Sequence, residues 1–116
     1  MSIKRIKVGP RMSQAVVHGN TVYVAGQVAR NSGGQGAKSE TQEILAAIDG
    51  LLAEAGSDKS KLLSATIWLK NMGDFSAMNE VWDAWVSPGN TPARACVESV
   101  LAAPQLTVEI AVFAAV

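Results

Sequence analysis

The chain has 116 residues, of which 48% are hydrophobic and only 17% are charged, with ten basic and ten acidic side chains. This length suits a single domain spanning residues 1–116, and the low charge suggests that part of the apolar surface is buried against copies of the same chain. The balanced charge argues against nucleic acid as the main partner, because nucleic-acid binding depends on neutralising phosphates.

Cysteine and histidine each occur once, which excludes an internal disulfide and argues against a metal site built from these ligands. No apolar run reaches the roughly twenty residues that a membrane helix needs. The beginning of the chain also lacks the apolar core of a signal peptide. We therefore expect no membrane partner and a reduced, cytoplasmic environment.

The first quarter of the chain reads as three antiparallel strands. Residues 1–8 alternate weakly and carry the lysines of an edge strand. Residues 11–18 follow, and Gly19-Asn20 forms a hairpin turn into residues 21–25. Gly26-Gln27 closes this third strand. The glycine is compatible with a simple turn or with a backbone that approaches a ligand closely.

Two helices with a strand between them come next. Ser39-Glu40-Thr41-Gln42 has the pattern of a capping box, in which Ser39 caps the helix and Gln42 reaches back to it. Apolar residues then recur at helical spacing until Gly56 ends the helix. Residues 62–69 read as a buried central strand. Asp74 is expected to cap a second helix, whose apolar face packs on the sheet. That face consists of Phe75, Met78, Val81, Trp82 and Trp85.

Residues 93–100 and 106–113 read as the last two strands, and both carry polar groups within an apolar pattern. A period of two places Arg94, Cys96 and Glu98 on one face of the first strand. In the second strand, Glu109 lies opposite the apolar face. The element order is therefore βββαβαββ. Two helices covering one side of a mostly antiparallel six-stranded sheet make an α+β two-layer sandwich.

These polar groups have two possible interpretations. They could form a solvated sheet face or an ion pair between subunits. Alternatively, they could line a pocket in which Arg94 holds a small carboxylate through a two-pronged hydrogen bond. In that pocket, Glu109 would handle a water molecule or a proton.

The run Pro92-Ala93-Arg94-x-Cys96-Val97-Glu98, followed by Val108-Glu109-Ile110, resembles the C-terminal signature of the RidA family, also called YjgF/YER057c/UK114. Gly19-Asn20, Gly26-Gln27 and Asp74-Phe75-x-x-x-Asn79 match other parts of the family pattern, so the resemblance covers nearly the whole chain. The resemblance implies a chorismate-mutase-like fold. It also implies a homotrimer with pockets between its subunits.

The resemblance further implies hydrolytic deamination of reactive enamines and imines, such as 2-iminopropanoate and 2-iminobutanoate, to 2-oxo acids and ammonia. Arg94 would anchor the substrate carboxylate, and Glu109 would orient the water and carry the proton. No metal and no organic cofactor is required, because the imine carbon is already electrophilic. Some family members have been described as ribonucleases, a role that the composition of this chain does not support.

The remaining expected substrate-binding positions are Gly26, Ala25, Asn79, Cys96 and Met12. The resemblance places Gly26 and Asn79 near the pocket. Cys96 is expected to be a small wall residue rather than a nucleophile, because no basic partner accompanies it. Met12 and Ala25 stand where many family members have a tyrosine and a serine.

The loss of these two hydroxyls leaves room for a different or bulkier imine. Two alternatives therefore stay open beside the general deaminase. One is a deaminase specialised to a single catabolic pathway, such as aminomuconate or aminoacrylate breakdown. The other is a trimeric module that binds a small carboxylate without turning it over. Arg94 alone would satisfy such a module, whereas the enzyme also needs Glu109.

Overall fold

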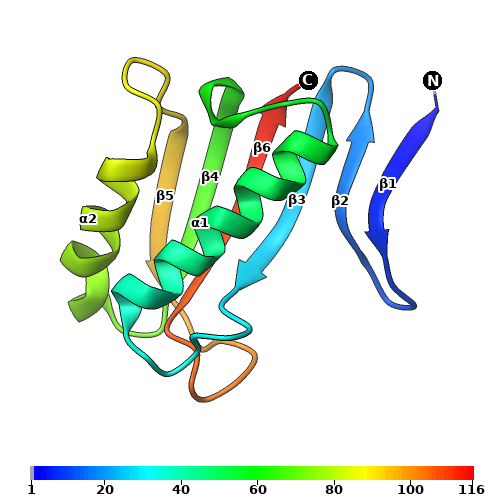
Figure 1. Cartoon of the computed structure of the whole chain (residues 1–116). Helices are drawn as coiled ribbons and strands as arrows, with labels where there is room; N and C mark the ends of the chain where they lie inside the picture. Colours follow the sequence, from blue (N-terminus) through cyan, green and yellow to red (C-terminus); the bar gives the residue numbers. More distant parts are fainter. Residues whose placement is uncertain (1) are drawn as a thin grey trace.

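The computed structural model describes residues 2–116, and Met1, which the first predicted strand included, lies outside this range. Both α-helices lie against one face of a single sheet, and the opposite face carries no helix (Figure 1). The strands are β1 (Ile3–Val8), β2 (Ser13–His18), β3 (Thr21–Val28), β4 (Leu62–Leu69), β5 (Ala93–Glu98) and β6 (Val108–Ala115). The helices are α1 (Ala37–Glu54) and α2 (Phe75–Trp85).

The six strands are ordered β1-β2-β3-β6-β4-β5 across the sheet. Every neighbouring pair is antiparallel except β4 and β5, which are parallel. Two layers, six strands and the order βββαβαββ confirm the predicted α+β sandwich. No helix among residues 2–116 has both the length and the apolar character needed to cross a membrane.

The core lies between the helices and the covered face of the sheet. Strand β6 alternates as predicted, and β4, which the sequence marked only as a buried central strand, alternates in the same way, so that about one side chain in two is buried against α1 and α2. The fully buried side chains of this layer include Ile67 and Leu69 of β4, Val108 and Ile110 of β6, and Ile44 and Ile48 of α1. The alternation of buried and exposed residues in β6 determines which of its side chains face the helices. Pairing with β4 determines the same for β5.

The predicted capping box at Ser39 is wrong. Helix α1 begins at Ala37, so Ser39 lies inside its first turn, and the N-cap is Gly36, which makes no side-chain capping bond. Gly36 has a φ of 102°, a backbone conformation that serine rarely adopts. The end of the helix is as predicted. Gly56 at φ 80° donates to the carbonyl of Ala53, and Ser57 donates to Leu52, which is a Schellman motif.

Strand boundaries in β2, β3, β5 and β6 also differ from the sequence-based ones. Strand β2 begins at Ser13, two residues later than predicted. Strand β3 does not close at Gly26-Gln27 but continues to Val28, with a bulge between Val24 and Gln27. Strand β5 ends at Glu98, two residues early, and β6 is shifted two residues towards the C-terminus.

Helix α2 begins after Asp74, but the carboxylate of Asp74 makes no capping bond. Asn71 instead caps the preceding 3₁₀ turn (Met72–Asp74) by accepting from the Gly73 N–H at 2.7 Å.

Glu40 replaces the predicted capping interaction with a longer-range one. Its side chain is fully buried at 0% exposure. One carboxylate oxygen accepts from the Thr107 N–H at 2.8 Å and the Val108 N–H at 3.3 Å, and the other accepts from the Thr107 hydroxyl at 2.8 Å. The start of α1 is thereby fixed to the start of β6, immediately before Glu109.

Glu40→Ala is expected to destabilise the fold by about 2–4 kcal/mol, because it leaves several buried donors without an acceptor. Urea unfolding monitored by circular dichroism measures this loss. Glu80→Ala is the matched control, because Glu80 is exposed and forms a 2.8 Å surface salt bridge with Lys38, an interaction worth about 0–1 kcal/mol. Equal losses in the two variants would contradict the role assigned to Glu40.

The uncovered face of the sheet carries large apolar side chains. Tyr23 and Phe113 pair across β3 and β6 with ring centroids 5.1 Å apart in an edge-to-face arrangement. They are 41% and 46% exposed, and Val97 on β5 is 46% exposed. Strand pairing puts Glu109 on this same face, across from Trp68 of β4. Tyr23, Phe113 and Val97 thus give the uncovered face of the sheet an exposed apolar patch.

Candidate functional site

Arg94 lies on the helix-covered face of the sheet. It pairs with Ala65 of β4, a buried core residue, and its side chain extends to α2. One guanidinium N–H donates to Oδ1 of Asn79 at 2.7 Å. The guanidinium carbon lies 5.4 Å from the ring centroid of Trp82 and 5.9 Å from that of Phe75. We call Arg94, Asn79, Phe75, Trp82 and Cys96 the arginine cluster.

Helix α2 supplies three members of this cluster from one of its faces. Phe75, Asn79 and Trp82 are spaced four and three residues apart, which aligns their side chains on a helix. The two rings favour a cation near their faces, and Asn79 fixes the orientation of the guanidinium. A guanidinium has five N–H donors, and Asn79 engages one nitrogen, so most of the donors of the exposed Arg94 can serve a carboxylate.

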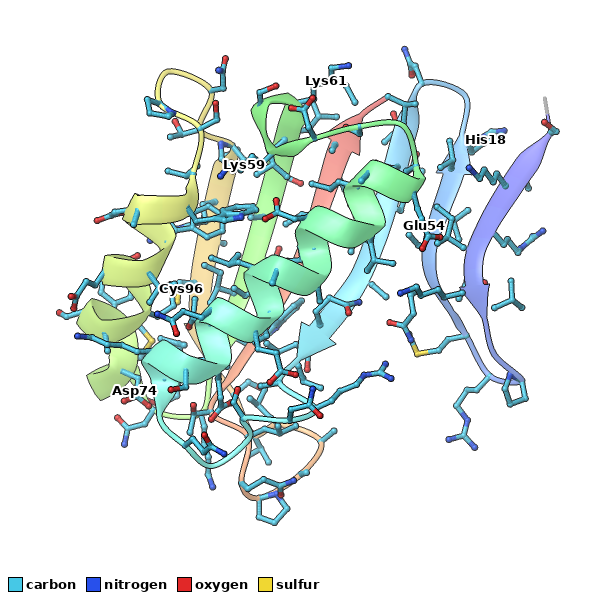
Figure 2. The ribbon with its side chains drawn as sticks, in the orientation of Figure 1. His18, Glu54, Lys59, Lys61, Asp74 and Cys96 are labelled. Atoms are coloured by element: carbon cyan, nitrogen blue, oxygen red, sulfur yellow. The ribbon has the colours of Figure 1, made fainter. Side chains whose placement is uncertain are left out.

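Cys96 lies two residues along β5, on the side that faces α2 (Figure 2), and is half-buried against the core. Burial raises the pKa of its thiol, and the positive charge of Arg94 offsets this only in part. The thiol is therefore protonated at neutral pH. This protonation state suits a wall residue and disfavours a nucleophile.

Glu109 lies on the opposite, uncovered face. It pairs with Val28 of β3, one residue beyond the β3 bulge. Its carboxyl group lies directly over Gly26, where a Cβ atom would overlap Oε2 and would approach Cδ to 3.0 Å. Gly26 is therefore needed for the position of this carboxylate, which connects two residues that the sequence analysis had proposed separately. We call Glu109 and Gly26 the glutamate cluster.

Burial raises the pKa of the Glu109 carboxyl above its usual value, and no charge or hydrogen bond from residues 2–116 counteracts this shift. A carboxylate in this situation binds a proton more readily than an exposed one. It also keeps its lone pairs available to a water molecule or a substrate. Both properties suit a group that alternates between base and acid.

Ala25 and Met12 border this cluster without adding a polar side chain. Ala25 is half-buried beside Gly26, and its carbonyl accepts from the Gln27 amide at 2.9 Å. Met12 is 47% exposed just before β2. The antiparallel pairing of Ala15 with Val24 places this end of β2 next to the β3 bulge. The lining of the site is thus apolar at the two positions where, from the resemblance, many family members carry a hydroxyl.

The two clusters lie on opposite faces of the same sheet. Arg94 faces α2, whereas Glu109 faces away from both helices. The structure therefore brings Arg94 together with Asn79 and Cys96, and Glu109 together with Gly26, but Arg94 and Glu109 do not meet within one chain. The sequence analysis took Phe75 and Trp82 only as core residues. Their spacing from Asn79 along α2 was the signal that could have identified them as its neighbours.

A double-mutant cycle can measure the energetic coupling between position 26 and the side chain of Glu109. Gly26→Ala is expected to cost about 1–3 kcal/mol of unfolding free energy, the usual range for overpacking. In a Glu109→Ala background the same change should cost much less, because the overlapping carboxyl group is gone. Urea unfolding of the four proteins gives both values. An equal cost in both backgrounds would mean that Glu109 does not lie over Gly26.

The fold and the site define a class of small α+β proteins. Members of this class have a two-layer sandwich that carries an arginine cluster on one face of the sheet and a glutamate on the other. The family model described as Endoribonuclease L-PSP matches residues 2–116. The chain belongs to this family, which is also the YjgF or RidA family.

Individual relatives agree over almost the full length. The chain is 45% identical over 116 residues to the RutC family protein YoaB of Escherichia coli, covering 100% of both chains. It is 44% identical over 114 residues to a RutC family protein of Haemophilus influenzae, covering 98% of each. A crystal structure of a YjgF-family protein from Neisseria meningitidis superposes with a TM-score of 0.96 at 47% identity, covering 99% of this chain and 95% of that one.

Proposed function

We propose that this protein hydrolyses small 2-imino acids to 2-oxo acids and ammonia, in pockets formed between copies of the chain in a homotrimer. The observation that carries the proposal is the position of Glu109, a carboxyl group with a raised pKa held over a side-chain-free Gly26. Arg94 supplies a second, complementary group with free donors for a substrate carboxylate. Imine hydrolysis needs both groups.

The chemistry follows from these two groups. Arg94 holds the substrate carboxylate and so fixes the imine carbon relative to Glu109. The Glu109 carboxylate takes a proton from water as the water oxygen bonds to that carbon. The C=N electron pair moves to nitrogen, and Glu109 returns the proton to it, which gives a neutral carbinolamine. The Glu109 carboxylate then takes the proton of the new hydroxyl group and passes it to the nitrogen as the C–N bond breaks, the carbonyl forms and ammonia leaves.

A pocket between subunits is favoured by the geometry of one chain. Arg94 and Glu109 lie on opposite faces of the sheet, so one substrate can reach both only if they come from two chains. The uncovered face around Tyr23 and Phe113 offers an apolar surface for self-association. Closed rotational symmetry would then produce identical pockets at every interface.

Substrate choice is expected to favour an imine with an apolar side chain. Met12 and Ala25 add no hydroxyl to the glutamate cluster, and an apolar wall favours apolar groups. This observation supports the specialised deaminase as a second candidate. Generating 2-iminopropanoate and 2-iminobutanoate in situ with an amino-acid oxidase, and following their decay, compares both substrates directly. If a folded trimer accelerates neither decay, the general deaminase is excluded, and a more specialised imine or a non-catalytic carboxylate-binding module takes its place.

The raised pKa of Glu109 predicts the acid limb of the pH–rate profile. The base form is lost as pH falls through this pKa, so kcat/KM should fall at a higher pH than an ordinary, solvent-exposed glutamate would cause. Initial rates across an acidic pH series measure the midpoint. A midpoint at or below the usual pKa of a glutamate side chain would contradict Glu109 as the base.

A further inference from the structure

A cleft lies on the helix-covered side of the sheet, opposite the face that carries Glu109, between α1 and the strands β1 to β3. It encloses about 500 Å³. Helix α1 contributes Ala46, Ala47, Gly50 and Leu51, and the remaining lining residues are Lys7, Gln14, Gln27 and Arg30. We call it the basic cleft.

Its charge is positive and uncompensated. Lys7 and Arg30 are exposed, and neither forms a salt bridge with any residue from 2 to 116. No lining residue carries a carboxylate. Glu43, on the preceding turn of α1, has its carboxylate engaged by the N–H groups of Asn31 and Ser32 at 2.7 to 3.2 Å. The two cations of the basic cleft therefore have no assigned counter-charge.

The groove between α1 and α2 differs in this respect. Lys38 is paired there with Glu80 at 2.8 Å, and Asp49 accepts from the indole N–H of Trp85 at 2.9 Å. With Lys59 also in the lining, that groove holds two cations and two carboxylates, so it offers no net charge to a ligand.

Amide groups give the basic cleft further donors. Gln27 is only 7% exposed, and its side-chain nitrogen donates to Oε1 of Gln14 at 3.0 Å and to the carbonyl of Ala25 at 2.9 Å. Both N–H groups of Gln27 are thus used, and the oxygen of Gln14 is satisfied. The side-chain nitrogen of Gln14 is left as a donor without a partner among residues 2–116, in a cleft that also holds two cations.

Two backbone features accompany this arrangement. Lys7 has a φ of 51°, in the left-handed region, which is uncommon for a residue with a side chain and costs on the order of 1 kcal/mol. Gly50 stands inside α1, where glycine costs about 1 kcal/mol relative to alanine. Packing does not require this glycine, because a Cβ there would meet no atom within 4 Å. A longer side chain at position 50 would instead occupy the cleft.

We propose that the basic cleft binds a small oxyanion, the carboxylate or phosphate group of a metabolite, at a site separate from the imine pocket. Lys7 and Arg30 neutralise the anion, and the Gln14 amide donates a hydrogen bond to it. Gln27 acts as a positioning residue by holding Gln14. The floor formed by Ala46, Ala47 and Gly50 leaves room for the ligand.

Amide NMR spectroscopy tests this site directly. Isotope-labelled protein is titrated with inorganic phosphate and, separately, with acetate, at constant ionic strength maintained with sodium chloride. We expect saturable shifts of the Gln14 and Gln27 side-chain amides and of the Gly50 backbone amide. Whichever probe saturates at the lower concentration identifies the preferred anion. Shifts that do not saturate, or that spread equally over all surface lysines, would overturn the proposal.

Variants separate specific binding from diffuse charge attraction. Lys7→Gln and Arg30→Gln should each weaken binding about tenfold, as expected for loss of a charge-assisted hydrogen bond. Lys61→Gln removes the same charge beside the start of β4, outside the cleft, and should change nothing. Gly50→Leu should abolish binding without lowering the melting temperature, since leucine is a good helix former. Unchanged binding in Gly50→Leu, or equal weakening in Lys61→Gln, would refute the site.

Discussion

Glu109→Gln is expected to lower kcat/KM for imine hydrolysis by about a hundredfold to ten-thousandfold, the usual contribution of a positioned acid–base group. Glutamine has nearly the same shape but cannot accept and return a proton. Binding of the 2-oxo acid product should persist, because the carboxylate anchor is Arg94. Coupled imine-decay assays give the rate, and isothermal titration with pyruvate gives the binding.

Loss of activity in this variant should not come from unfolding. Burial raises the pKa of Glu109 in the folded state, so the folded protein binds this proton more tightly than the unfolded chain does. Stability therefore decreases as pH rises through the interval from the unfolded to the folded pKa, and the penalty is complete above it. Glu109→Gln removes the ionisation and should be at least as stable as wild type at neutral pH.

Glu80→Gln is the matched control for this experiment. Glu80 is an exposed residue of α2 outside both clusters, and the same change of side chain there should leave turnover intact. If Glu109→Gln retains more than half of the wild-type rate, Glu109 is not the proton carrier. If wild type binds pyruvate but shows no turnover with any imine, the carboxylate-binding module is the better description.

Strand and helix order followed from the sequence because hydrophobic periodicity is a local property. The alternation in residues 106–113 identified the core-facing side chains of β6, and with them the opposite face on which Glu109 lies. The capping box failed for the opposite reason. Glu40 is held by Thr107, 67 positions away, and no local pattern reveals this contact.

The candidate site, like the fold, was predictable only where it depends on local sequence patterns. The residue types and the periodicity of β5 pointed to Arg94. The helical spacing of Phe75, Asn79 and Trp82 on α2 held the information that these three side chains surround its guanidinium. The overlap of Glu109 with Gly26 depends on the pairing of β3 with β6 and on a bulge, which are tertiary features. The sequence analysis therefore proposed both residues without connecting them.

Mixing two inactive variants should restore activity. Arg94→Ala removes the anchor and Glu109→Gln removes the proton carrier, so each variant alone is expected to lack turnover. In a mixed assembly, a pocket that takes its arginine from the Glu109→Gln chain and its glutamate from the Arg94→Ala chain has both native groups. Refolding the two together in equal amounts and measuring imine decay tests whether the pocket is shared.

Random pairing predicts the size of the recovery. Each pocket takes its arginine and its glutamate from different chains, so roughly a quarter of the pockets should be intact for any closed ring. This fraction does not depend on the number of subunits, and native mass spectrometry is needed to identify the trimer. Mixed assemblies without recovered activity would show that Arg94 and Glu109 do not act across an interface. A pocket within one chain could not then explain the wild-type activity, because Arg94 and Glu109 lie on opposite faces of one sheet. The shared roles assigned to these two residues would therefore be wrong.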